Sequence, residues 1–269
     1  MDDSEFQAIL DHEEGHWWYR GRLRIILDEV ERLAPLPGAT ILDAGCGSGR
    51  VMKELGRFGD VVGADVNPAA VAASRARRAG RVVEASVDEL PFPDESFSLV
   101  TCLDVIEHTP DDVATMRELR RVTAPGGHML VTVPAYPALW STHDEVNEHY
   151  RRYRRRSLRD AAARAGWELD RDGHFNSLLL APAAAVRLAS RFLRGATASR
   201  GNSELALTPR ALDSLLELPL RLEAALVRSG VNLPAGLSLI ATFRKPVEAR
   251  AAYVRPLRRV RRNAPSVAH

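Results

Sequence analysis

The run ILDAGCGSG at residues 41–49 decides the fold class, because an apolar segment leads directly into three alternating glycines. Glycine adopts the positive φ angles of a tight turn, and without a Cβ atom it lets a ligand lie against the backbone. The run therefore predicts a β-strand, a ligand-binding turn over Gly45, Gly47 and Gly49, and a following helix. Asp65 ends the next apolar segment about 20 residues past the first glycine, where a carboxylate can bind the hydroxyls of a ribose. The pattern favours a nucleoside-like ligand over the first two strands.

Short β-rich segments alternate with helical segments around this run, which is typical of a parallel sheet. Asn67 before Pro68 predicts a helix N-cap, and Thr109 before Pro110 gives the same signal before a second helix. The expected strands are at 41–42, 61–64, 97–103, 128–133, 167–175 and 237–243, and the expected helices are at 17–33, 50–57, 68–78, 112–122 and 158–165. The sequence thus predicts an α/β, Rossmann-like fold with a seven-stranded, mostly parallel sheet and helices on both faces.

The chain divides into three parts along its length. Residues 1–38 are expected to form an N-terminal lid built on an amphipathic helix, and residues 39–245 the ligand-binding domain. A Leu- and Ala-rich insertion at 177–235 separates the last two strands, and we expect a helical cap there. Residues 246–269 are basic and hold few apolar anchors, so we expect a mobile tail.

Composition excludes several classes of protein. The 269 residues are 45% hydrophobic and 27% charged, as in globular proteins, and a net charge of +2 gives no case for nucleic-acid binding. Cys46 and Cys102 are too few for a disulfide framework or a metal-ligand cluster, so we expect a reduced, cytoplasmic protein. The first residues are acidic, unlike an export signal, and the apolar stretch 178–186 is about half the ~20 residues of a membrane span.

Two cofactor classes compete for the glycine turn. The dinucleotide fingerprint is GxGxxG, whereas this turn reads GxGxG, and Asp43 precedes it where an acidic group suits a cationic ligand better than a diphosphate. Together with LPFPDESF at 90–97 and DVIEH at 104–108, the turn makes the chain resemble the class I S-adenosylmethionine-dependent methyltransferases. The resemblance is strong over residues 39–133 and weaker beyond them, and it implies S-adenosylmethionine as the cofactor.

The resemblance also implies roles for single residues. The glycine turn would cradle the methionyl part of the cofactor, Asp65 would hold the ribose hydroxyls, and the backbone around Cys102 and Leu103 would meet the amino group. Ser86 stands where similar proteins have an aspartate for the adenine amino group, and Asp88 is a substitute two residues on. The implied cofactor-binding set is Asp43, Gly45, Cys46, Gly47, Gly49, Asp65, Val66, Ser86, Val87, Cys102 and Leu103.

Methyl transfer to a hydroxyl or an acidic carbon requires a base, because the acceptor loses a proton. The in-line displacement itself needs no metal, and we expect none. The run WSTHDEVNEHYRRY at 140–153 follows the fifth strand and supplies two imidazoles with carboxylates nearby. His143 with Asp144 is the preferred base and His149 the reserve, whereas the Glu-His pair at 107–108 is expected on the cofactor side or in a helix cap.

Three surface features are candidates for binding the acceptor or a partner. The aromatic cluster formed by His12 and residues 16–19 is expected either to close over the cofactor or to pack against the sheet. The arginines within 151–156 could bind an anionic group, but a solvated charge run is favoured because they cannot all face one ligand. For the insertion we rank three alternatives: a lid over an apolar pocket is favoured first, a dimer face second and a peripheral membrane contact third.

We therefore expect a methyltransferase that acts on an oxygen or carbon of a small-molecule acceptor. A hydrophobic natural product of secondary metabolism or a lipid-linked compound fits the apolar insertion. Two alternatives stay open: an enzyme of the same fold with a non-methylating reaction such as cyclisation, and a non-catalytic scaffold. No nucleic-acid partner and no transmembrane segment are expected, and the chain is expected to be a monomer or a homodimer.

Overall fold

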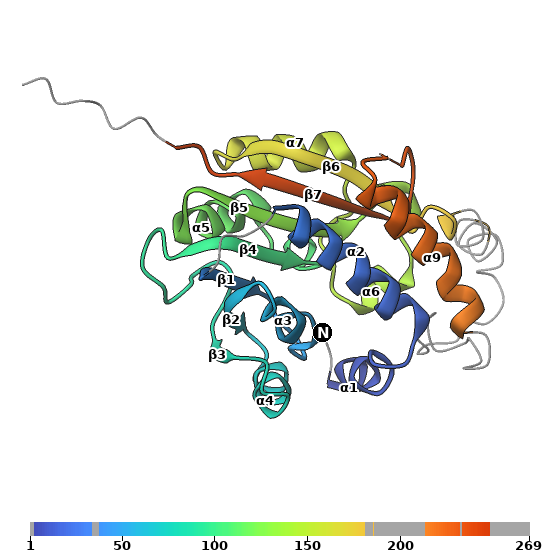
Figure 1. Cartoon of the computed structure of the whole chain (residues 1–269), viewed down its shortest axis with the longest axis horizontal. Helices are drawn as coiled ribbons and strands as arrows, with labels where there is room; N and C mark the ends of the chain where they lie inside the picture. Colours follow the sequence, from blue (N-terminus) through green and yellow to red (C-terminus); the bar gives the residue numbers. More distant parts are fainter. Residues whose placement is uncertain (1–2, 34–37, 181–184, 186–212, 232, 248–269) are drawn as a thin grey trace, which may run out of the picture.

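The computed structural model describes residues 3–33, 38–180, 185, 213–231 and 233–247. Its central feature is a seven-stranded sheet in the order β3-β2-β1-β4-β5-β7-β6 (Figure 1). Strands β1 to β5 pair in parallel, whereas β7 is antiparallel to both β5 and β6. The strands are β1 Ala39–Ala44, β2 Gly59–Asp65, β3 Arg81–Glu84, β4 Phe97–Leu103, β5 Thr123–Pro134, β6 Glu168–Phe175 and β7 Ser238–Arg244. The predicted seven-stranded, mostly parallel sheet is confirmed.

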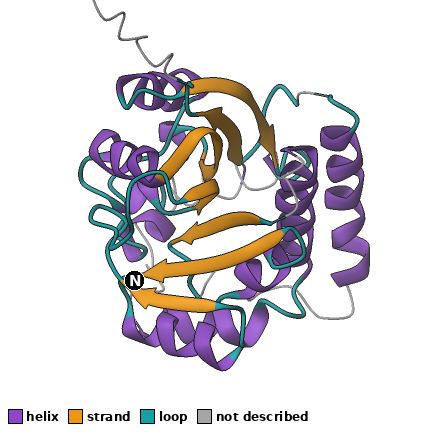
Figure 2. Cartoon of the chain, turned by 60° about the vertical axis from the view of Figure 1, so that its left-hand side comes forward, coloured by secondary structure: helices purple, strands orange, loops and turns teal. Residues whose placement is uncertain are grey.

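Helices cover both faces of this sheet (Figure 2). The α-helices are α1 Asp3–His12, α2 Trp17–Leu33, α3 Arg50–Leu55, α4 Pro68–Ala76, α5 Asp112–Val122, α6 Thr142–Val146, α7 Arg155–Arg164 and α9 Asp213–Arg228, and the 3-10 helices are η1 Ile106–His108 and η2 Pro137–Leu139. Neighbouring residues of a strand point to opposite faces of the sheet, so each strand contributes side chains to the hydrophobic cores on both faces. Leu42 and Val100 pack with α5 and α7, whereas Ile41 and Leu99 pack with α2, α3, α4 and α9.

Local signals place several helix ends. The Asn67 side chain accepts a hydrogen bond from the amide of Ala69 at 2.8 Å, so the predicted N-cap of α4 is confirmed. The N-cap of α5 is Asp111 and not the predicted Thr109, because the Asp111 carboxylate accepts from the first free amides of the helix. Thr109 instead donates to the carbonyl of Ile106 in η1.

The N-terminal part of the chain packs on the predicted insertion. Helices α2 and α9 lie side by side, and a Cβ atom on Gly21 would collide with the Leu220 side chain between them. Most of the remaining insertion and nearly all of the predicted tail lie outside the described residues, and the lid, cap and tail stay predictions. Among the helices that the structure describes, none has both the length and the apolar character needed to cross a membrane.

The strand order reverses between β1 and β4, which lie next to each other with their crossover connections on opposite sides. Open α/β sheets bind ligands in the crevice at such a switch point, beyond the carboxyl ends of the strands. The glycine turn and the residues after β4 and β5 all lie at this edge.

Candidate active site

The glycine turn leaves β1 at the switch point. Gly45, Gly47 and Gly49 have φ angles of 76°, 52° and 75°, which lie in the left-handed region that favours glycine. A Cβ atom on Gly45 would collide with Val105, and one on Gly49 would collide with Ser74. A Cβ on Gly47 would meet no described atom within 4 Å. Two glycines are therefore required by packing as well as by backbone angle, and the middle one faces open space.

Asp65 is held at the tip of β2 by the turn itself. One carboxylate oxygen accepts from the Gly47 amide at 2.8 Å, and the other accepts from the Asn67 amide at 2.9 Å. Each oxygen keeps further acceptor capacity for a ribose hydroxyl. Val66 beside it is 69% exposed, an apolar side chain open to a flat ligand at the same edge.

Asp43 lies below the turn and is only 2% exposed. The Thr101 hydroxyl donates to it at 2.6 Å. Burial raises the pKa of Asp43 to about 6, although the Thr101 hydrogen bond and the Arg22 charge act in the opposite direction. A carboxylate in this position is stabilised by a cationic ligand.

The other predicted cofactor residues surround the same edge. Ser86 accepts from the Asp88 amide at 3.2 Å, and the Asp88 carboxylate accepts from the Thr115 hydroxyl of α5. One Asp88 oxygen is thus engaged by the protein. Val87 is buried and Leu103 is half-buried.

Both cysteines are buried thiols. Burial raises the pKa of Cys46 to about 12 and that of Cys102 well above its ordinary value, so neither forms a thiolate near neutral pH. This chemistry supports a packing role for Cys46 over a nucleophilic one.

The N-terminal segment contacts the glycine turn directly. The Ser48 hydroxyl, inside the turn, donates to buried Glu13 at 2.5 Å, and Arg77 forms ion pairs with Glu13 and Glu14. Within the predicted aromatic cluster, Trp18 and Tyr19 stack edge to face at 4.9 Å, and the Arg22 guanidinium lies 5.8 Å from the Trp18 ring. The contacts of Glu13 and Glu14 join the segment between α1 and α2 to the glycine turn.

The Asp144 carboxylate in the segment after β5 is fully buried and accepts hydrogen bonds through both of its oxygens. One oxygen accepts from His149 Nδ1 at 2.9 Å and Arg152 Nε at 2.6 Å, and the other accepts from the Ser141 amide at 2.8 Å. Burial alone would raise the pKa of Asp144, but the hydrogen bonds from His149 and Arg152 hold it well below its ordinary value. Because an ionised carboxylate only accepts, His149 must carry its proton on Nδ1.

The structure directs the Asp144 carboxylate toward His149 and Arg152 rather than toward its neighbour His143. Adjacent residues of a helix point in directions about 100° apart, and Asp144 turns inward to cap α6. His143 instead contacts the Asn147 amide, which lies 3.2 Å from Nδ1 and donates to the His143 carbonyl at 2.8 Å. The role of His143 as a base stays a prediction.

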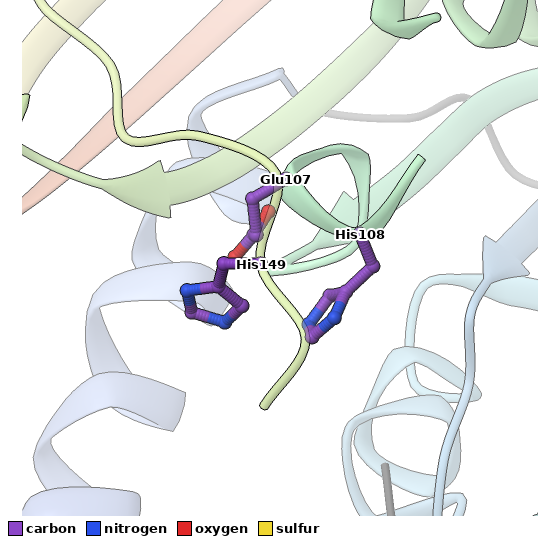
Figure 3. A group of neighbouring side chains, drawn as sticks. All are labelled: Glu107, His108 and His149. Carbon is purple, nitrogen blue, oxygen red and sulfur yellow. The ribbon is translucent and has the colours of Figure 1, made fainter. Parts of the chain in front are cut away.

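The structure brings His149 to the Glu-His pair that follows β4 (Figure 3). The rings of His108 and His149 lie 4.6 Å apart, edge to face, and Glu107 lies beside them. Burial, followed by the Asp104 charge, raises the pKa of Glu107 well above its ordinary value. Burial and then His149 lower the pKa of His108 to about 4.

Sequence reasoning named all three residues of this cluster but did not combine them. The available signal was that β4 and β5 are parallel neighbours, so the loops after them share one edge of the sheet. The cluster also adjoins the glycine turn, because Gly45 packs against Val105, two residues before Glu107.

Residues 42–131 match a family model described as a methyltransferase domain. The chain contains a class I S-adenosylmethionine-dependent methyltransferase domain. The matched residues run from β1 into β5 and include the glycine turn, Asp65 and the Glu-His pair at 107–108. The match thus covers the cofactor edge and ends before the loop that holds His149.

Relatives of the methyltransferase domain agree with this match. The ubiquinone biosynthesis O-methyltransferase of Alkalilimnicola ehrlichii is 38% identical over 112 residues, which are 39% of this chain and 45% of that protein. The chain therefore spans about half the length of the curated relatives it matches. A methyltransferase of Haloferax volcanii, solved with an activator, gives a TM-score of 0.59 at 19% identity and covers 91% of this chain and 95% of its own.

A Bacillus halodurans structure described as a methyltransferase gives a TM-score of 0.56 at 19% identity, covering 82% of this chain and 98% of its own. Sequence identities of 19% support a shared fold but not a shared substrate or activity.

The arginine run after the loop is engaged by the protein's own carboxylates. Its ion pairs are Arg151 with Asp112, Arg152 with Asp144, Arg155 with Asp172 and Arg156 with Asp160. Arg156 is 93% exposed but Arg152 is buried, so the run that we expected to be solvated is solvated only in part. Side chains that leave one segment in several directions hold the fold together here.

Proposed function

We propose that this protein transfers the methyl group of S-adenosylmethionine to an oxygen of a small-molecule acceptor. The observation that carries the proposal is the shared edge of the sheet. Asp43, the glycine turn and Asp65 form a cradle for a cationic nucleoside, and the Glu107, His108 and His149 cluster lies beside it. This arrangement supports adjacent positions for the cofactor and the acceptor, as an in-line displacement requires.

An oxygen acceptor is favoured over a carbon acceptor. A hydroxyl is a weak nucleophile until it loses its proton, and the cluster offers imidazole and carboxylate groups for that step. The curated relatives are named O-methyltransferases, which supports the same choice.

We also propose that the acceptor has an apolar part. Helix α9 carries Leu215, Leu218 and Leu222 as exposed side chains, and it packs on α2, the helix whose Arg22 pairs with Asp104 after β4. Exposed leucines at this spacing suit an apolar or lipid-linked molecule. Because both cysteines are free thiols, a reducing compartment such as the cytoplasm is the proposed location.

The test combines binding with product mass. Calorimetry of the full chain with S-adenosylmethionine comes first, with Asp65→Ala as the variant that should bind more weakly and Asp60→Asn, an exposed carboxylate elsewhere, as the matched control. The chain is then incubated with the cofactor and a panel of phenols and catechols that carry short or long alkyl tails. Mass spectrometry should find products heavier by one methyl group, formed faster from the long-tailed acceptors.

Two results would contradict this proposal, and each would leave a different alternative. An absence of cofactor binding would leave the scaffold alternative. A product of unchanged mass would favour a non-methylating reaction such as cyclisation.

A further inference from the structure

We propose that Glu107, His108 and His149 form a site for a divalent transition-metal cation, which holds the acceptor hydroxyl and promotes the loss of its proton. The catalytic half of this proposal rests on the proposed methyl transfer, whereas the binding half stands alone.

The donor atoms come from two segments that the fold brings together. Glu107 and His108 follow β4 in η1, and His149 follows α6 (Figure 3). One ligand atom from each of the three side chains lies within 4.8 Å of the other two. One carboxylate with two imidazoles is a donor set that binds Mn²⁺, Fe²⁺, Co²⁺, Ni²⁺ or Zn²⁺ and leaves coordination positions open.

An independent observation points to a missing partner at this place. Glu107 is 1% exposed, and neither of its carboxylate oxygens has a hydrogen-bond partner among the residues that the structure describes. A buried carboxyl group without partners is costly and rare in native proteins, so it calls for a ligand. Nearby guanidinium groups are engaged elsewhere, because Arg22 binds Asp104 at 2.6 Å and Arg152 binds Asp144 at 2.6 Å.

Residues behind the cluster orient its imidazoles as they do in protein metal sites. Asp144 accepts the Nδ1 proton of His149, which leaves the Nε2 lone pair for a cation. The Asn147 backbone is a hydrogen-bond partner of the His108 ring. Asp144 is fully buried and is itself held by Ser141 and Arg152, so the His149 ring has a defined direction.

A cation held by three side chains has room for the acceptor oxygen. It would act as a Lewis acid that lowers the pKa of the bound hydroxyl. The O–H bond breaks and its proton passes to water, the O–CH₃ bond forms as the S–CH₃ bond breaks, and the electron pair of that bond stays on sulfur. No oxidation or reduction takes place.

The test starts with binding to the full chain after dialysis against a chelator. Cobalt is the probe, because its visible absorption reports nitrogen and oxygen ligands, and calorimetry gives the stoichiometry. The wild type should bind one Co²⁺ per chain. Glu107→Gln and His149→Ala should lose that binding. Asp144→Asn, whose side chain contacts His149 and none of the other proposed ligands, should weaken it roughly ten- to hundredfold. His128→Gln, a half-buried histidine in β5, is the matched control that should bind Co²⁺ as the wild type does.

A second measurement separates this proposal from the proposed function. Each variant is titrated with S-adenosylmethionine, which should bind with unchanged affinity and so report an intact fold. Chelation should then abolish methyl transfer, and added Co²⁺, Mn²⁺ or Zn²⁺ should restore it.

Three results would each overturn the metal proposal. The wild type could bind no Co²⁺, Glu107→Gln could bind Co²⁺ as tightly as the wild type, or methyl transfer could continue at full rate after chelation. In the last case the proposed function would survive, with His149 as a metal-free base.

Discussion

Replacing Asp43 by asparagine should make the cofactor-free protein more stable at neutral pH. Burial raises the pKa of this carboxyl from its ordinary value of 3.8 to about 6, against the opposing hydrogen bond from Thr101. At about 1.4 kcal/mol for each pH unit between the two pKa values, the ionised carboxylate costs the folded state about 3 kcal/mol. An asparagine amide keeps an oxygen for the Thr101 hydroxyl and carries no charge.

The sign of the pH dependence follows from where the protons are bound. Between about pH 4 and about pH 6 the folded protein holds a proton on Asp43 that the unfolded chain has lost, so wild-type stability falls as the pH rises through this window. Above about pH 6 both states are ionised and this contribution levels off. The variant has no such step, and its advantage should grow from near zero at about pH 4 to about 3 kcal/mol at neutral pH.

Urea unfolding followed by tryptophan fluorescence measures this difference across the pH range. Asp60→Asn, an exposed carboxylate in β2, is the control that should leave the curve unchanged. Calorimetry should show the opposite effect on function, because the variant lacks the charge that favours the cationic cofactor and should bind it more weakly. Equal pH dependence in variant and wild type, or a less stable variant at neutral pH, would refute the reasoning.

Three further changes test other parts of the structure. Gly49→Ala should destabilise the fold by about 1–3 kcal/mol in urea and weaken cofactor binding, because φ is 75° there and the new Cβ would strike Ser74; wild-type values in both assays would contradict the required glycine. Gly21→Ala should cost about 1–3 kcal/mol by forcing α2 away from Leu220, and an unchanged unfolding curve would show that the contact relaxes freely. His143→Ala should slow turnover with near-normal cofactor affinity, and full turnover would remove this histidine from the base role.

Local sequence signals located much of the fold. The helices at 17–33 and 112–122 and the strand at 97–103 have the predicted ends, because hydrophobic periodicity and flanking caps act within a few residues. Strand β3 was not located, since it has four residues and lies at the edge of the sheet, where burial leaves little pattern. Helices α1 and α6 were not predicted either, because short helices depend on their tertiary contacts.

The two halves of the candidate site differ in the same way. The glycine turn and Asp65 were identified from sequence because they adjoin in the chain and the backbone angles demand glycine. The partner of Asp144 could not be identified from sequence, because His149 lies five positions after it. The choice between His143 and His149 depends on which way α6 faces.

The sequence by itself determined the alternating α/β pattern, the glycine turn with its acidic neighbours and the residue types available after β4 and β5. Only the tertiary structure decided that Glu107, His108 and His149 meet, that Glu107 is buried without a hydrogen-bond partner among the described residues, and that Asp144 orients His149. The physical reason is that backbone angles and helix caps are set by neighbours along the chain. Contacts between side chains more than forty residues apart are set by the pairing of parallel strands, which brings their carboxyl ends to one edge of the sheet.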